Sequence, residues 1–287
     1  MSLPAGLHLR VARPDDLSGV AELRESVGWA SHDWALRAVL DGPHARCFLA
    51  TDGTDRMVGV GSGIDYGSFG VVGNMVVVPE HRRHGIGAAL LEAVLAFLDE
   101  RGCTRLELSA TELGRPLYAS YGFAMAEEGT SAVIGRSAMQ AEPAAVDLAD
   151  AEPEALAELA AFDAPRFGGD RTPLLATMLA DPARPVAVAR DGGAMVGWGW
   201  IRPEANRIGP LVADSPDVAI ALVADAMRRM PAAATLRLTM PPGNRDGVDR
   251  LGLLGAELES WDGRMARGPA VERRDETLYA SSVGALG

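Results

Sequence analysis

The chain has 287 residues, of which 48% are hydrophobic and 23% charged, which is typical of a soluble globular protein with two domains. Its net charge of −12 argues against nucleic acid as a partner, because nucleic-acid phosphates would be repelled. Two cysteines, Cys47 and Cys103, provide neither a disulfide framework nor a metal site. The sequence has no apolar run long enough for a signal peptide or a membrane helix, so we expect a cytoplasmic protein without a membrane partner.

Helices and strands alternate through the first half of the chain. The patterns predict strands over residues 7–11, 47–51, 57–64, 71–78 and 106–110, and helices over 14–26, 29–40, 86–101 and 116–121. The strand at 57–64 is rich in glycine, which predicts a bulge or the close approach of another backbone. A last pair of strands is expected within residues 125–133.

The second half repeats this order of elements after a change in composition. Residues 139–152 are rich in Ala, Glu, Asp and Pro without a sustained period, which predicts a linker between domains at 1–138 and 153–287. We expect helices over 153–162, 172–179, 218–230 and 245–254, a hairpin of 186–189 with 195–201, and strands over 208–212 and 236–240. The two halves therefore predict one shared topology.

Residues 74–88 carry the clearest chemical signal. An apolar strand stops at Pro79, a basic turn follows, and a long amphipathic helix begins at Ile86. The first amides of a helix have no internal partners, and the helix dipole favours an anion there. Gly85 and Gly87 would let a phosphate approach the backbone. The pattern predicts a diphosphate-binding site.

Two other phosphate-binding motifs do not fit this turn. A P-loop needs a lysine after its glycines, and the chain has no lysine; a dinucleotide fold needs a third glycine, which is missing. The pattern Arg82-x-x-Gly85-x-Gly87 is instead similar to the acetyl-CoA signature of the GNAT superfamily of N-acetyltransferases. Residues 117–123, which begin Leu-Tyr and end Gly-Phe, resemble an element that these enzymes carry after their fifth strand.

The resemblance, which covers residues 8–135, implies an α/β fold of GNAT type with acetyl-CoA as cosubstrate and no metal. The backbone of Val76, Val77 and Val78 would pair with the pantetheine arm and stabilise an oxyanion. Thr111 would contact the cosubstrate or cap its strand. The residues that would hold the diphosphate are Arg82, Arg83, His84, Gly85, Ile86, Gly87 and Ala88.

The resemblance also suggests catalytic and acceptor-binding residues. Tyr118 matches the family tyrosine that protonates the departing thiolate, with a structural packing role as the alternative. Asp65 is the first candidate for the general base, with Glu107 and Glu112 as alternatives. Trp29 and Asp33 are expected to line the acceptor pocket, where an aromatic ring and a carboxylate could clasp a cation.

The second half lacks the features of the cofactor turn. Residues 208–217 stand in its place with no glycine pair and no arginine, and Asp214 and Asp217 would repel an anion. The sequence therefore predicts a tandem arrangement whose second, degenerate GNAT-like domain has lost CoA binding. Residues 162–171 resemble the C-terminal domain of some two-domain GNAT proteins. Its Asp163, Asp170 and Arg171 either reach the first pocket or form an inter-domain salt-bridge and capping segment.

Together these features predict an acetyl-CoA-dependent N-acetyltransferase that acts directly, in a ternary complex, on a primary amine of a small molecule. Two alternatives stay open: an acyl-CoA-binding regulatory protein without turnover, and a peptide or protein N-acetyltransferase. A homodimer is one assembly that the sequence allows.

Overall fold

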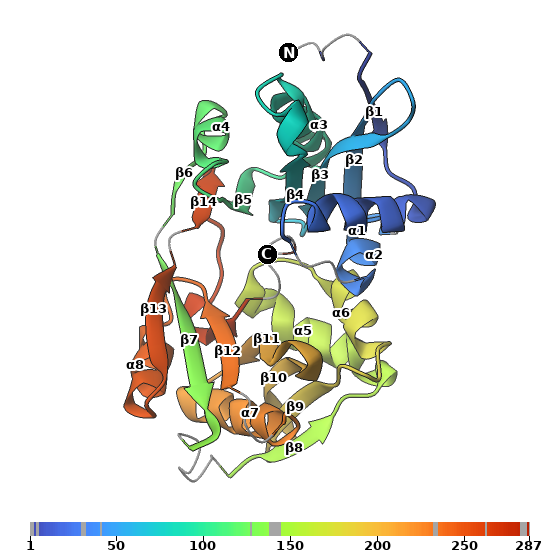
Figure 1. Ribbon diagram of the computed structural model, residues 1–287. Helices are drawn as coiled ribbons and strands as arrows, with labels where there is room; N and C mark the ends of the chain where they lie inside the picture. Colours follow the sequence, from blue (N-terminus) through green and yellow to red (C-terminus); the bar gives the residue numbers. More distant parts are fainter. Residues whose placement is uncertain are drawn as a thin grey trace. The chain divides into compact units, whose positions relative to one another are not determined.

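The computed structural model describes residues 3, 6–29, 33–40, 42–126, 128–137, 145–231, 235–261, 263–281 and 286. The chain divides into two compact units (Figure 1). Unit 1 comprises residues 1–125, 265–271 and 283–287, and unit 2 comprises residues 126–264 and 272–282. Each unit is a mixed α/β structure, so the predicted fold class is confirmed.

Unit 1 forms, within the described residues, a seven-stranded sheet in the order β1-β2-β3-β4-β5-β14-β6. Its strands are β1 (His8–Val11), β2 (Ala45–Thr51), β3 (Met57–Asp65), β4 (Phe69–Val77), β5 (Arg105–Ser109), β6 (Ala124–Met125) and β14 (Arg264–Arg267). Its helices are α1 (Leu17–Glu25), α2 (Asp33–Leu40), α3 (Ile86–Glu100) and α4 (Arg115–Ser120), with short 3-10 turns η1 (Pro14–Asp16) and η2 (Pro79–His81). Strands β1 to β4 are antiparallel, whereas β4 and β5 are parallel.

Three glycines let α3 pack closely against the sheet of unit 1. Gly59, Gly61 and Gly63 alternate along β3, so they face the same side. A Cβ atom at Gly59 would lie 3.0 Å from Leu90, and one at Gly63 would lie 3.1 Å from Phe97, both on α3. A Cβ atom at Gly59 would also lie 3.1 Å from the Val76 carbonyl of β4, so the predicted close approach of another backbone is confirmed, and helix side chains add to it.

The apolar stripe predicted on α3 is confirmed as the centre of that packing. Each side chain of this stripe is at most 6% exposed: Leu90, Leu91, Val94, Leu95 and Leu98. With 15 residues, α3 is too short to cross a membrane, and no helix elsewhere in the described parts of the chain is long and apolar enough to do so.

Unit 2 repeats this plan with an eight-stranded sheet, counted over the described residues, in the order β13-β7-β12-β11-β10-β9-β8, with β15 paired to β11. Its strands are β7 (Gly129–Gly135), β8 (Asp147–Asp150), β9 (Val186–Asp191), β10 (Ala194–Arg202), β11 (Arg207–Ala213), β12 (Thr235–Met240), β13 (Glu257–Trp261) and β15 (Leu278–Ala280). Its helices are α5 (Leu156–Phe167), α6 (Thr172–Leu179), α7 (Pro216–Arg228) and α8 (Arg245–Leu253), with 3-10 turns η4 (Pro153–Ala155), η5 (Pro203–Ala205) and η6 (Asp275–Thr277).

The last strands of the two halves are exchanged. The sequence predicts that β6 and β7 form a pair, and this is wrong: β6 pairs with β14, and β7 lies between β12 and β13 (Figure 1). In unit 1, β14 takes the place between β5 and β6. The prediction failed because alternating apolar residues identify a strand without identifying the sheet that it joins.

Part of the predicted linker is also a strand. Residues 147–150 form β8, which pairs antiparallel with β9 at the edge of the unit 2 sheet, while residues 139–144 lie outside the described part of the chain. Asp147 and Asp150 place charge on this edge strand, which explains its polar composition. The compact units therefore do not follow the predicted division into 1–138 and 153–287.

Candidate functional site

The candidate site in unit 1 is built where β4 and β5 separate. The two strands pair in parallel from Phe69 with Arg105 to Val72 with Leu108, and β4 then continues to Val77 while β5 ends at Ser109. Beyond Val72 no described strand pairs with this edge of β4. An extended ligand could therefore add to the free edge as a strand would.

Hydrogen bonds near the end of β4 show which amide faces this gap. The Val78 N–H donates to the Val58 carbonyl of β3 at 3.0 Å. Because successive N–H groups of a strand point to opposite edges, the Val77 N–H points into the gap. The Val77 carbonyl accepts from Arg82 Nε at 2.9 Å, which holds that guanidinium beside the same edge.

The turn between β4 and α3 has the shape of an anion cradle. Arg83 and Gly85 both adopt left-handed backbone angles, with φ of 64° and 82°. Gly85 is the N-cap of α3 and no side chain hydrogen-bonds to the cap, so the first helix amides keep their donors for a ligand. Arg83 and His84 are exposed, whereas the Ile86 side chain is buried and only its backbone can serve this site.

Gly87 is not explained by packing within the protein. A Cβ atom there would lie 3.5 Å from Leu117 and 3.8 Å from Val77, which are ordinary contacts. The missing side chain therefore leaves space over the first turn of α3, as approach of a phosphate would require. Ala88, the next predicted contact, is buried and faces the core.

Helix α4 brings Tyr118 to the same end of the sheet, next to Leu117. Tyr118 is 6% exposed and its ring lies 6.2 Å from that of Phe123. Burial raises the pKa of Tyr118 to about 12, so the phenol stays protonated at neutral pH.

Thr111 follows β5 and begins the turn into α4. Its carbonyl accepts from the amides of Gly114 at 2.9 Å and Arg115 at 3.1 Å. Its side chain is exposed at the β5 side of the gap. The Thr111 carbonyl therefore closes the turn after β5, and the exposed side chain is positioned where it could also contact a ligand.

Asp65 is in the wrong place to act as the general base. It ends β3 and pairs with Gly70, so it lies at the opposite end of the strands from Val77, about 23 Å away along β4. Its carboxylate accepts from Arg101 at 2.8 Å and from the Gly67 amide at 2.7 Å. Although burial raises the pKa of Asp65, the bonds from Gly67, Arg101 and Cys103 lower it overall, so the group is a poor proton acceptor.

The two alternative carboxylates differ in their surroundings. Glu107 is buried on β5 and accepts from Arg105 Nε at 3.1 Å, so it is held as a structural ion pair. Glu112 is exposed in the loop after β5.

The structure places Trp29 near the site but not as a cation clasp. The guanidinium of Arg24 lies 5.5 Å from the Trp29 ring, so this protein's own cation already occupies the aromatic surface. Asp33 is exposed in the first turn of α2, where a carboxylate suits the helix start. The two residues are therefore not brought together around an empty cation pocket.

Three residues near the gap were missed by the sequence analysis. Arg24 Nη1 donates to Asn74 Oδ1, and Asn74 Nδ2 donates to Ser62 Oγ at 2.9 Å. Asn74 is buried in the middle of β4 with φ of 53°. A single amide side chain inside an otherwise apolar strand was the signal in the sequence that could have identified this contact.

In unit 2 the helix that corresponds to α3 begins differently. Ser215 is the N-cap of α7, and its hydroxyl accepts from the Val218 amide at 3.3 Å. Asp214, just before it, accepts from Arg166 at 2.7 Å. The protein thus caps this helix itself, and acidic groups stand where the turn of unit 1 has arginines.

The gap between β11 and β12 in unit 2 is filled by the chain. These strands pair only at Arg207 with Arg237. Strand β15 then enters between them: Val212 of β11 pairs with Leu278, and Ser281 N donates to the Thr239 carbonyl of β12 at 2.8 Å. The edge that corresponds to the free edge of β4 is therefore already occupied.

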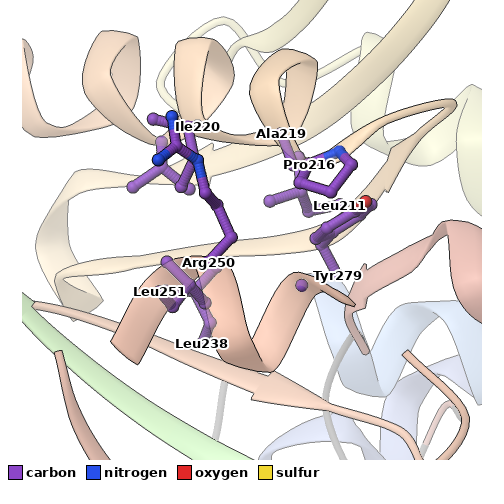
Figure 2. Close-up of a pocket in the computed structure, with 10 residues that line it drawn as sticks. Leu211, Pro216, Ala219, Ile220, Leu238, Arg250, Leu251 and Tyr279 are labelled. Carbon is purple, nitrogen blue, oxygen red and sulfur yellow. The ribbon is translucent and has the colours of Figure 1, made fainter. Parts of the chain in front are cut away.

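A small pocket lies beside β15, between α7 and α8 (Figure 2). Its lining is mostly apolar, with Ile220 of α7 facing Leu251 of α8 and the ring of Tyr279 closing one side. Its one charged lining residue, Arg250, pairs with Asp217 at 3.0 Å. The cavity offers no group for a diphosphate.

The segment at 162–171 serves the interior of unit 2. Arg171 donates to both oxygens of Asp163 at 2.7 Å, and Trp198 Nε1 donates to Asp163 at 3.1 Å. Asp170 caps α6 by accepting from the Thr172 amide at 2.9 Å. Asp163 and Arg171 are both buried in this ion pair inside unit 2, so they form a salt bridge within one unit and not one between domains.

Two family models match the chain, and each is described as an acetyltransferase (GNAT) domain. One covers residues 43–125 and the other residues 159–280. Among the described residues, no three His, Cys, Asp or Glu side chains gather as they would around a metal ion.

Similar proteins agree with these models. YitH of Bacillus subtilis (strain 168), an uncharacterized N-acetyltransferase, is 31% identical over 165 residues, and the match spans 55% of this chain and 56% of that protein. The chain therefore spans little more than half the length of this relative. The structure of a candidate acetyltransferase from Pyrococcus horikoshii superposes with a TM-score of 0.81 at 22% identity, covering 100% of this chain and 98% of that one. A tandem GNAT protein from the clavulanic acid biosynthesis pathway gives a TM-score of 0.62 at 16% identity, covering 92% and 99%.

Proposed function

Because the chain belongs to the GNAT family of acetyltransferases, with two such domains in tandem, we propose that unit 1 transfers an acetyl group from acetyl-CoA to a primary amine of a small molecule. One observation carries the proposal. The free edge of β4 and the uncapped start of α3 lie at the same end of one sheet, joined by a turn of only a few residues. Such a surface suits a ligand with an extended amide arm and a diphosphate.

The residues of unit 1 divide the work of binding between backbone and charge. Amides from Gly85 onwards, in the left-handed turn and first turn of α3, would hold the diphosphate. Arg82 and Arg83 would add positive charge. The free edge of β4 would pair with the pantetheine arm, which places the thioester near the Val77 N–H.

Transfer then needs the amine to attack the thioester carbonyl. The C–N bond forms as the carbonyl oxygen takes up negative charge, which the Val77 N–H would stabilise. The attacking nitrogen gives up a proton to solvent water, the C–S bond breaks, and the sulfur leaves as a thiolate that is protonated from solvent. Tyr118, which stays protonated at neutral pH because burial raises its pKa to about 12, would stabilise the departing thiolate by donating a hydrogen bond to the sulfur.

Incubation of the full chain with acetyl-CoA and a panel of primary amines tests this function, with release of free thiol as the measurement. We expect thiol release that depends on the amine. Tyr118→Phe should lower kcat by about 100-fold, since a hydrogen-bond donor positioned at developing charge contributes this much or more, with little change in the affinity for acetyl-CoA.

Two results would count against the proposal. Tight binding of acetyl-CoA without thiol release from any small amine, but with release from peptides, would favour a peptide acetyltransferase. Binding without release from either would favour a regulatory protein that binds acyl-CoA. Unchanged kcat in Tyr118→Phe would remove Tyr118 from the mechanism while leaving the binding site intact.

A further inference from the structure

Strand β4 contains an extra residue at the point where it leaves β5. Val60 of β3 pairs with Val76, and Ser62 pairs with Gly73, so Gly61 alone faces both Asn74 and Met75. Asn74 takes a left-handed conformation with φ of 53°, as the extra residue of a bulge often does. Ser62 and Gly73 form one cross-strand pair, and the bulge begins directly after them.

The bulge sets which way the end of β4 faces. A strand alternates its side chains and its N–H groups, so one extra residue reverses everything that follows it. Beyond the bulge, Met75 packs at Gly61 on the α3 side, where a glycine Cβ would lie 2.7 Å from its sulfur. The same reversal directs the Val77 N–H into the gap. Loss of the bulge would turn that amide away.

Contacts from two other elements hold Asn74 in this conformation. On one side the Asn74 amide nitrogen donates to Ser62 Oγ of β3 at 2.9 Å. On the other side its oxygen accepts from the guanidinium of Arg24, on α1. A hydrogen bond from a charged donor is about twice as strong as one between neutral groups. The buried side-chain amide of Asn74 is therefore hydrogen-bonded through both its nitrogen and its oxygen.

Arg24 is itself fixed in place by the loop after α1. Its guanidinium lies 5.5 Å from the Trp29 ring, and the Trp29 amide donates to the Arg24 carbonyl at 3.0 Å. Burial lowers the pKa of Arg24, although the group stays charged near neutrality. The loop that carries Trp29 is thus connected through Arg24 to the backbone of β4.

We propose that Arg24, Asn74 and Ser62 form a clamp that positions the Val77 amide for acetyl transfer. The inference rests on the proposed function of unit 1. Arg24 and Asn74 are positioning residues in it, since they act through the β4 backbone. The clamp should affect the reaction rate more than the binding of acetyl-CoA, because the diphosphate is held at the start of α3.

The variant Asn74→Gly tests the clamp without straining the bulge, because glycine adopts the left-handed conformation readily. We expect kcat to fall by about 10- to 100-fold, as displacement of a reacting group by about 1 Å can cause. The affinity for acetyl-CoA, measured by calorimetry, should change by less than about threefold on the same reasoning. Asn206→Gly is the matched control: Asn206 is also left-handed, with φ of 49°, but lies in unit 2 and should leave kcat unchanged.

Two further variants keep the test decisive if Asn74→Gly folds poorly. Ser62→Ala and Arg24→Gln each remove one contact to Asn74, and both should lower kcat. The double variant of Arg24→Gln with Asn74→Gly should be no slower than the slower single variant, since residues of one network are not additive. Wild-type kcat in Asn74→Gly, or fully additive losses, would overturn the clamp.

Hydrogen exchange separates failure of the clamp from failure of the proposed function. The clamp predicts faster exchange of the Val78 amide, which donates to the Val58 carbonyl of β3, in Asn74→Gly than in wild type, and no such change in Asn206→Gly. This measurement needs no turnover. If the wild-type chain releases no thiol with any amine, the proposed function falls while exchange still decides whether the clamp holds β4. Unchanged exchange would refute the clamp even in an active enzyme.

Discussion

The starts of α3 and α7 show how one fold leaves the first helix amides without a side-chain cap in one unit and caps them in the other. In unit 1 a left-handed Gly85 precedes the helix and no side chain caps it. In unit 2 the Ser215 hydroxyl satisfies the Val218 amide, and Asp217 stands at the second helical position, which Gly87 holds in unit 1. A change of a few residues in one turn therefore decides whether helix amides face a ligand or the protein itself.

The gaps in the two sheets differ in the same sense. The edge of β4 beyond Val72 is unpaired by any described strand, whereas the corresponding edge of β11 is paired with β15. Strand β15 also bonds to β12 through Ser281. In unit 2 a piece of polypeptide lies where an extended ligand would lie in unit 1, so both parts of the site are filled from within.

The largest loss of affinity for acetyl-CoA is expected from a substitution at the start of α3. Gly87→Glu should lower the affinity for acetyl-CoA by roughly 100-fold or more, since a carboxylate brought against a diphosphate costs several kcal/mol. The fold should survive, because an acidic residue suits the first turn of a helix. Calorimetry should show one binding site per chain in the wild type and none in the variant.

The converse substitution in unit 2 is the matched control. Asp217→Gly removes the acidic residue at the equivalent position of α7, yet β15 and the Ser215 cap remain. We expect it to bind acetyl-CoA with the same stoichiometry as wild type. A second bound equivalent, or residual tight binding in Gly87→Glu, would contradict our assignment of the site to unit 1.

A smaller effect, on stability, tests whether β15 fills the gap in the unit 2 sheet. A Cβ atom at Gly209 on β11 would lie 2.5 Å from the Ser281 carbonyl, just after β15. Gly209→Ala should therefore destabilise the chain by about 2 kcal/mol or more, from this overlap and from the φ of 155° that disfavours a residue with a Cβ, without changing the affinity for acetyl-CoA. Denaturant unfolding measures the first quantity. Gly135→Ala, which meets only Ser137 Oγ at 3.9 Å, should be nearly neutral. Equal stability of both variants would show that β15 is not seated tightly.

The smallest change in stability is expected at Asp65, at the end of the unit 1 strands that is farthest from Val77. Asp65→Asn should leave kcat unchanged and destabilise the chain at pH 7 by about 0.5–1 kcal/mol, because Arg101 is half-exposed. The folded pKa of Asp65 lies below the unfolded value of about 3.9, so this stability is present above that pH and is lost as pH falls through the folded pKa. The difference between the two proteins should vanish in acid. A large loss of kcat would return Asp65 to the mechanism.

Local patterns were enough to predict most elements near the site. The apolar run before Pro79, the glycine pair and the stripe on α3 placed a strand, a turn and a helix in order, and the structure has them as β4, residues 78–85 and α3. These features depend on neighbours a few residues apart. The tandem topology followed from the same kind of pattern repeated in the second half.

Contacts between distant residues could not be predicted in this way. Arg24 meets Asn74 across 50 positions, and nothing in either neighbourhood specifies the other. Strand β15 has no distinctive period over its three residues, and its role depends entirely on the gap that it enters. Asp65 was wrongly expected at the site because the local sequence of a strand end does not indicate at which end of the sheet that residue lies.

The exchange of β7 and β14 has a consequence for how such a protein can change over generations. Because each half contributes a strand that lies one position in from an edge of the other half's sheet, a gene cut between the halves would yield two products with incomplete sheets. Each would expose bare strand edges, which invite aggregation. Two domains that exchange strands are therefore committed to inheritance as a single polypeptide, even where only one of them keeps an open strand edge.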